Sequence, residues 1–145
     1  MDKAIKIDPK NALAYYNRGL VLHSKGADTR AIADFTQSIK LDDKNALAFY
    51  NRGLAYHEKG DLDRALADFD QAVTLDPSRA EAYYQRGNAL YEKQAYDKAI
   101  ADLNRAINIK PDYTAAFNAR GLAYTAKNDS SRAIADFDQA VRIDP

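Results

Sequence analysis

The chain has 145 residues, 46% of them hydrophobic, which is enough apolar material for one ordinary domain with a packed core. Lysine and arginine number 21, and so do aspartate and glutamate, so no net charge favours nucleic acid or anionic membranes as partners. Cysteine is absent, which excludes disulfides, thiolate nucleophiles and cysteine-based metal centres.

The first segment, residues 1–11, is expected to be the stub of a helix. Its residues Ala4 to Pro9 match Ala72 to Pro77 further along, and proline disfavours the helical conformation in the residue before it. The segment lacks the apolar core of a signal peptide, and no stretch of the chain approaches a membrane span. We therefore expect a cytoplasmic protein, unless the chain is cut from a larger one.

From Ala12 onward a pattern returns every 34 residues. Tyr-Asn-Arg-Gly-Leu at 16–20 recurs at 50–54, as Tyr-Gln-Arg-Gly-Asn at 84–88, and more loosely at 118–122. A second pattern, typified by Arg-Ala-Ile-Ala-Asp-Phe, starts at residues 30, 64, 98 and 132. Self-similarity at a fixed period indicates a repeat protein. We predict four repeats forming one continuous domain, at residues 12–45, 46–79, 80–113 and 114–145.

Each repeat is predicted to hold two helices, because its apolar residues recur at helical spacing. Turn residues such as Lys59-Gly60-Asp61 separate the two, and Asp61 can cap the second helix. Prolines are expected to mark the ends of second helices, at Pro9, Pro77, Pro111 and Pro145. Candidate caps for the first helices are Asn11, Asn45, Ser78 and Asp112.

Four of the six glycines lie inside predicted helices, at Gly19, Gly53, Gly87 and Gly121. A glycine within a helix costs about 1 kcal/mol relative to alanine. A cost that recurs in every repeat implies a recurring need. We expect that need to be the close approach of two helix backbones.

These residues, in the order aromatic, glycine, alanine, phenylalanine, alanine and proline, resemble the tetratricopeptide repeat over nearly the whole chain. The resemblance implies an all-α, right-handed superhelical solenoid of antiparallel helix-turn-helix hairpins. It also implies that the first helices line a concave, partner-binding groove. Two departures from the family pattern recur along the chain. Arginine replaces the family's usual leucine before the glycine, and tyrosine or phenylalanine replaces its usual tryptophan.

The arginine before each glycine has an aspartate counterpart in the following helix. In an antiparallel hairpin the two positions can face each other, so we predict partly buried ion pairs that fix the register. An alternative reading is an arginine ladder for phosphate or RNA. The matched acids and zero net charge argue against that alternative. The predicted pairs are Arg18 with Asp34, Arg52 with Asp68, Arg86 with Asp102, and Arg120 with Asp136.

The groove positions that the family register implies are rich in tyrosine and carboxamides. Tyrosine offers rigid amphipathic surface, and a carboxamide offers both a donor and an acceptor to a peptide backbone. The alternative is that these residues only bond to neighbouring repeats. The predicted groove residues are Leu13, Tyr16, Asn17, Leu20, His23, Leu47, Tyr50, Asn51, Leu54, His57, Glu81, Tyr84, Gln85, Asn88, Tyr91 and Asn118.

Another ligand mode known in this family, the clamp for acidic chaperone C-termini, requires basic residues at fixed groove positions. Those positions carry Tyr16, Glu81 and Gln85, or, one repeat later, Tyr50, Ala115 and Ala119. None of them is basic. We therefore do not expect chaperone tails as ligands.

Metal, cofactor and catalytic sites are not expected. His23 and His57 lie one repeat apart, but zinc needs about three or four converging ligands. No nucleophile has an evident base, and the helical glycines form no phosphate loop.

The remaining expectation is an interaction scaffold that holds a peptide or protein segment, with neither nucleic acid nor membrane as partner. The alternative is self-assembly. Neither end of the array carries a polar capping helix, which indicates a fragment of a longer array or chains that stack end to end.

Overall fold

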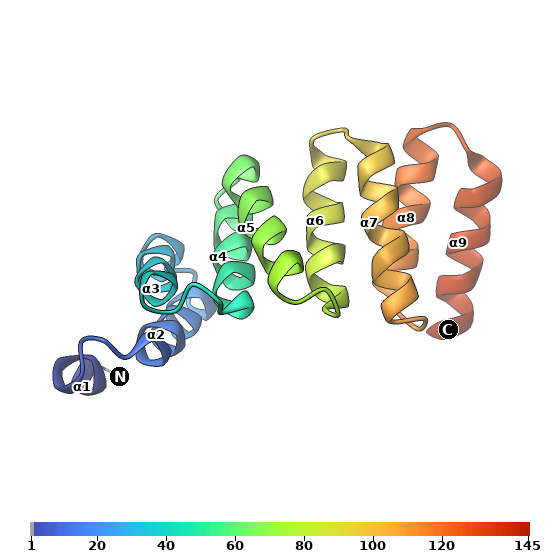
Figure 1. Cartoon of the computed structure of the whole chain (residues 1–145). Helices are drawn as coiled ribbons and strands as arrows, with labels where there is room; N and C mark the ends of the chain where they lie inside the picture. The colour runs from blue at the N-terminus through green and yellow to red at the C-terminus, as the bar shows by residue number, and fades with distance from the viewer. Residues whose placement is uncertain (1) are drawn as a thin grey trace. The chain divides into compact units, whose positions relative to one another are not determined.

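The computed structural model describes the backbone of residues 2–145 and the side chains from Ile5 onward. Regular structure within residues 2–145 is entirely α-helical (Figure 1), as the sequence predicts. The helices are α1 (Asp2–Ile7), α2 (Ala12–Ser24), α3 (Asp28–Leu41), α4 (Ala46–Glu58), α5 (Leu62–Leu75), α6 (Ala80–Glu92), α7 (Tyr96–Ile109), α8 (Thr114–Ala126) and α9 (Ser130–Ile143).

Successive helices pair into hairpins, α2 with α3, α4 with α5, α6 with α7 and α8 with α9. The chain divides into two compact units, an N-terminal unit that ends at Pro77 and a C-terminal unit from Ser78 to Pro145. Within the N-terminal unit α4 also packs on α3 and touches α2. Within the C-terminal unit α8 likewise packs on α7 and touches α6.

Local sequence signals account for most of the helix ends. Helices α5, α7 and α9 each stop two residues before a proline. The side chains of Asn11 and Asn45 accept the backbone N–H groups of Ala14 and Ala48, and so cap α2 and α4. At the hairpin turns one residue adopts a left-handed conformation, with φ between 60° and 73°, at Gly26, Gly60, Gln94 and Asn128.

Two of the predicted caps are wrong. The residue that precedes α6 is Arg79 and the one that precedes α8 is Tyr113, and neither makes a side-chain cap. These residues lie 34 and 68 positions after Asn45, so they, rather than Ser78 and Asp112, are its equivalents. The repeat conserves the start of the helix even where the residue there cannot cap.

The core of each hairpin lies where a glycine of the first helix faces a large side chain of the second. A Cβ added to Gly53 would lie 2.7 Å from Cε1 of Phe69, a fully buried ring. Gly19 and Gly121 face Phe35 and Phe137 in the same way. Gly87 faces Leu103 instead. The glycine therefore makes room for a large side chain, which corrects the expectation that it allows two backbones to meet.

In the C-terminal unit the core continues from one hairpin into the next. Leu103, Ala106 and Ile107 of α7 form one buried cluster with Ala116 and Phe117 of α8. The second helix of one hairpin is thus covered by the first helix of the next. Among the described residues, no helix combines the length and the apolar character needed to cross a membrane.

Candidate partner-binding faces

The arginine before each helical glycine is held inside its own hairpin. Arg52 Nε and Nη2 donate to the two carboxylate oxygens of Asp68 at 2.8 and 2.7 Å. The same two-point pairing joins Arg18 to Asp34, Arg86 to Asp102 and Arg120 to Asp136, with distances from 2.6 to 2.8 Å. Two parallel bonds fix the angle of the guanidinium as well as its position. The pairs thus set the register between the two helices.

The surroundings of these arginines reinforce the pairing. The Asp68 side chain is 5% exposed and the Arg52 side chain 17%. The hydrogen bonds that Arg52 donates to the Asp68 carboxylate raise the pKa of Arg52 above its ordinary value, against the opposing effect of burial. The Arg52 guanidinium also lies 5.7 Å from the centre of the Phe49 ring, and the other three arginines lie near the equivalent rings.

Two of the arginines reach a third helix, which the sequence analysis missed. Arg52 Nη1 donates to Thr36 on α3 at 3.0 Å, and Arg120 Nη1 donates to Asn104 on α7 at 2.6 Å. Both acceptors lie 16 residues before their arginine, at equivalent positions of the repeat. The sequence did contain a signal for this contact, because a small polar residue recurs at the repeat position of Thr36 and Asn104. The arginine therefore also ties successive hairpins together.

The residues predicted to line a groove lie on contacting helices in the N-terminal unit, α2 and α4. Helical spacing places Leu13, Tyr16, Asn17 and Leu20 on one side of α2, and α2 contacts α4. Two of these α2 residues are exposed to solvent: Leu13, whose exposed fraction is 61%, and Asn17. Leu47 on α4 is 36% exposed, while Leu20, Leu54 and Tyr50 are half-buried.

Some of these residues also support the packing. Asn51 Nδ2 donates to the Tyr16 hydroxyl at 3.2 Å and to the Leu47 carbonyl at 2.8 Å, which engages both amide hydrogens. The Tyr16 and Tyr50 rings lie 6.0 and 6.1 Å from the rings of Phe35 and Phe69. Tyr16 and Asn51 therefore help to join α2 to α4.

The two histidines of the predicted face lie near the turn ends of their hairpins. His23 Nδ1 is 2.7 Å from Asp28 Oδ1 at the start of α3, and His57 is half-buried in the last turn of α4. The His23–Asp28 contact links the end of one helix to the beginning of the next. Over the residues whose side chains are described, no group of three or more histidines and carboxylates could hold a metal ion.

The C-terminal unit has a more polar face on α6 and α8. Glu81, Gln85 and Asn88 are half-buried on α6, and Asn118 is exposed on α8. The Tyr84 ring lies 5.1 Å from the Tyr113 ring, beside the buried cluster. Tyr91 packs in the same way on Tyr96, at 5.4 Å. Tyr113, which precedes α8, was not among the predicted residues.

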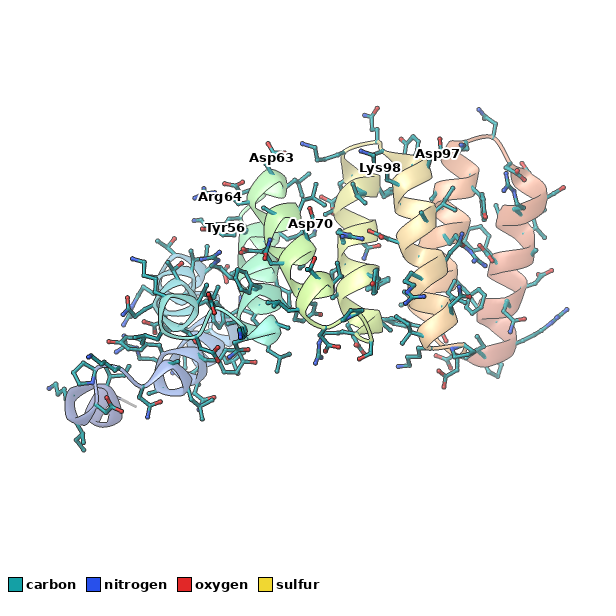
Figure 2. All side chains as sticks on the ribbon, viewed as in Figure 1. Tyr56, Asp63, Arg64, Asp70, Asp97 and Lys98 are labelled. Carbon is teal, nitrogen blue, oxygen red and sulfur yellow. The ribbon has the colours of Figure 1, made fainter. Side chains whose placement is uncertain are left out.

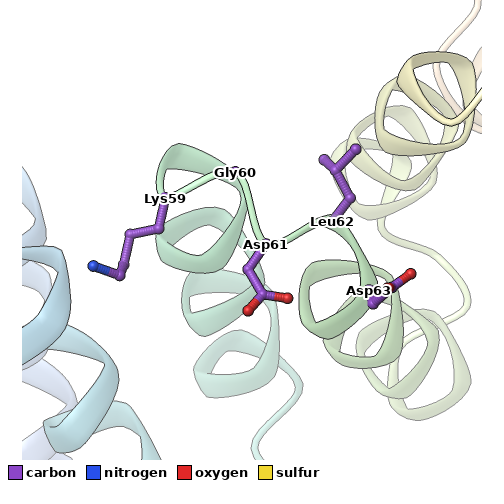
Figure 3. A pocket seen from close by; sticks show the side chains of 5 residues that line it. All are labelled: Lys59, Gly60, Asp61, Leu62 and Asp63. Carbon is purple, nitrogen blue, oxygen red and sulfur yellow. The ribbon is translucent and has the colours of Figure 1, made fainter.

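Two hollows lie at hairpin turns in the described part of the chain. One, of about 350 Å³, is lined by Lys59, Gly60, Asp61, Leu62 and Asp63 (Figure 3). Beside it Arg64 lies over the Tyr56 ring, 4.6 Å from the ring centre (Figure 2), and the Arg64 hydrogen bonds hold the pKa of Asp61 below its usual value. The second hollow lies at the α6–α7 turn and includes Lys98 and Lys127. Neither brings together groups that would suit catalysis.

Comparison with protein families identifies the chain. The TPR repeat profile matches residues 2–26, 19–60, 53–94 and 87–128, and a second profile, the tetratricopeptide repeat, matches residues 114–145. Together these matches extend over nearly the whole chain. The chain therefore belongs to the tetratricopeptide repeat family, as its sequence pattern indicates. No curated protein sequence matches it.

Solved structures of the same fold include three informative neighbours. A crystal structure of MamA is 29% identical, with a TM-score of 0.94, and the match covers 98% of this chain and 83% of MamA. The first TPR of Spaghetti (RPAP3), bound to the HSP90 peptide SRMEEVD, is 27% identical with a TM-score of 0.80, over 83% of this chain and 96% of that one. The Arabidopsis OM64 TPR domain is 25% identical with a TM-score of 0.77, over 79% and 94%.

Proposed function

We propose that this protein is a non-catalytic interaction scaffold that binds a polypeptide segment on the first-helix face of the N-terminal unit. The observation that carries the proposal is the open surface around Leu13 and Asn17, beside the tyrosines of α2 and α4. It combines exposed apolar area with a carboxamide, as a peptide with apolar side chains and a polar backbone requires. The peptide-bound RPAP3 structure supports this role for the fold.

The charges on the first-helix face indicate which kind of peptide it could bind. The predicted groove residues of α2 and α4 include no lysine or arginine. The HSP90 peptide held by RPAP3 contains two glutamates and an aspartate, and this face offers them no counter-charge. A carboxylate desolvated without a partner is costly. We therefore propose an uncharged, apolar segment as the ligand.

The test is selection from a displayed library of random peptides, followed by calorimetric titration of the enriched peptides. The groove variant is Leu13→Ser with Asn17→Ala, because both residues are exposed and their replacement leaves the Tyr16–Asn51 contact in place. We expect it to weaken binding about tenfold or more, as loss of about 1.4 kcal/mol would do. Enriched peptides should be poor in acidic residues.

A matched control changes a leucine and a carboxamide at the same spacing on a second helix. Gln71 and Leu75 of α5 are four residues apart and exposed, so Leu75→Ser with Gln71→Ala removes equivalent groups elsewhere. We expect this control to bind like the unaltered chain. Equal losses in the two variants, or none in the groove variant, would place the binding surface somewhere else.

A second candidate function is self-association through the end helices. The specific observation is the exposure of two large apolar residues on α9, Ile134 at 59% and Val141 at 64%. Apolar area of this kind is a common feature of interaction sites. A second copy of the chain is one way to cover it.

A further inference from the structure

A lysine at the end of a first helix reaches back to the preceding hairpin in both compact units. In the N-terminal unit Lys59, which follows α4, donates from Nζ to Thr29 Oγ1 on α3 at 3.0 Å. Its side chain points away from its own turn, toward the preceding hairpin (Figure 3). In the C-terminal unit Lys127, which follows α8, forms an ion pair with Asp97 on α7. The two contacts are equivalent, because Lys127 and Asp97 each lie 68 positions after their counterparts.

The repeat position of Thr29 carries either a carboxylate or a hydroxyl group. Thr29 is the second residue of α3, and the second residues of α5, α7 and α9 are Asp63, Asp97 and Ser131. All four are exposed, and Figure 2 labels the two aspartates near the turns that precede α5 and α7. A hydroxyl is neutral, but phosphorylation gives it about −1.5 to −2 charges at neutral pH and three strong acceptor oxygens. Modification of Thr29 would therefore supply the negative charge that Asp97 carries permanently.

The surroundings of Thr29 suit such a charge. The Lys59 ammonium group lies within hydrogen-bonding distance and carries three donors on a flexible stem, so it can follow a larger acceptor. The adjacent acid is Asp28, whose Oδ1 lies 2.7 Å from His23 Nδ1 and is thus already engaged. A phosphate on Thr29 would have a cation beside it on the next hairpin.

We propose that Thr29 is a phosphorylation site, and that its phosphate forms an ion pair with Lys59 that joins hairpin α2–α3 to hairpin α4–α5. A protein kinase transfers the γ-phosphoryl group of ATP to Thr29 Oγ1: the new O–P bond forms, the bond to the ADP leaving group breaks, and the hydroxyl proton passes to solvent. The exposed hydroxyl beside a hairpin turn is accessible to such an enzyme. Charge-assisted hydrogen bonds then replace a neutral one.

The first experiment measures the thermal unfolding of the 145-residue chain phosphorylated at Thr29, prepared by chemical ligation, and of the unmodified chain. The pH is kept above the second pKa of the phosphate, about 6, so that the group is a dianion. We expect phosphorylation to raise the Tm by about 2–4 °C and the gain to shrink at high ionic strength. Lys59→Gln should remove most of the gain. No gain, or a gain that persists in the Lys59→Gln variant, would overturn the proposed ion pair.

Matched substitutions exchange the two side chains between the equivalent positions. Thr29→Asp places a carboxylate beside Lys59, and Asp97→Thr places a hydroxyl beside Lys127. Both positions are second in their helices, so the contribution of the helix dipole is similar in size and opposite in sign. We expect Thr29→Asp to raise the Tm and Asp97→Thr to lower it by a similar amount, with both effects reduced when the lysine is replaced by Gln. Effects that do not depend on the lysines would contradict the equivalence.

The last experiment asks whether cells carry out the modification. The protein is isolated, with phosphatase inhibitors, from the cells that make it, and phosphopeptides are located by mass spectrometry. We expect phosphate on Thr29. The internal control is Thr74, an exposed threonine whose hydroxyl donates to the Asp70 carbonyl oxygen of its own helix. Absence of phosphate from Thr29, or equal occupancy at Thr74, would overturn the assignment of the site even if the ion pair forms in the ligated chain.

Discussion

The inside of the hairpins and the outward faces of the first helices differ in how strictly they repeat. Inside the hairpins the arginine–aspartate geometry recurs four times within 2.6 to 2.8 Å, and every helical glycine faces a large side chain. On the faces, α2 and α4 offer leucine and asparagine, whereas α6 offers Glu81 and Asn88. Residues that every repeat shares thus build the hairpin, and the residues that vary lie on the face for which we propose a binding role.

The largest loss of stability is expected when one partner of the repeated ion pair is removed. Asp68→Ala leaves the Arg52 guanidinium, whose side chain is only 17% exposed, without its carboxylate. We expect a loss of about 3 kcal/mol in the free energy of unfolding, as for other broken buried pairs. Urea denaturation followed by circular dichroism measures it. The control is Asp43→Ala, at an exposed position before α4; a similar loss in both variants would contradict a special role for the pair.

A smaller effect is expected from filling the space above the buried rings. Gly53→Ala places a methyl group 2.7 Å from Phe69, and overpacking of this kind costs about 1–3 kcal/mol. Alanine recovers about 1 kcal/mol of helix propensity. Gly87→Ala meets Leu103 at 3.0 Å, which demands a smaller shift. Thermal unfolding should rank Gly53→Ala below Gly87→Ala in stability; the reverse order would show that the ring moves more easily than the leucine.

The smallest change in the free energy of unfolding is expected from a substitution on the first-helix face. Leu13 is 61% exposed, so Leu13→Ser should change the free energy of unfolding by no more than about 0.5 kcal/mol. The same denaturation measurement checks it. Phe35→Ser, at a fully buried position in the same hairpin, serves as the contrast and should destabilise strongly. A large loss from Leu13→Ser would mean that the face contributes to the fold.

Sequence reasoning succeeded where the signal is local to one hairpin. Proline positions predicted the ends of α5, α7 and α9, and the period of 34 residues matches the spacing at which α2, α4, α6 and α8 begin. It failed at the caps of α6 and α8, where Ser78 and Asp112 lie one residue before the true position. It also gave the wrong neighbour for the helical glycines, since spacing alone does not distinguish a backbone from the Phe69 ring.

The sequence by itself determined the all-helical repeat and the family, because helix period, turn residues and prolines act over a few neighbouring positions. Only the tertiary structure revealed that Arg52 reaches Thr36, that Asn51 holds Tyr16, and that Asn17 lies exposed. The physical reason is that exposure and partnership depend on which helix covers a residue. Ile107 and Val141 occupy the same place in the repeat, yet one is buried by α8 and the other is open.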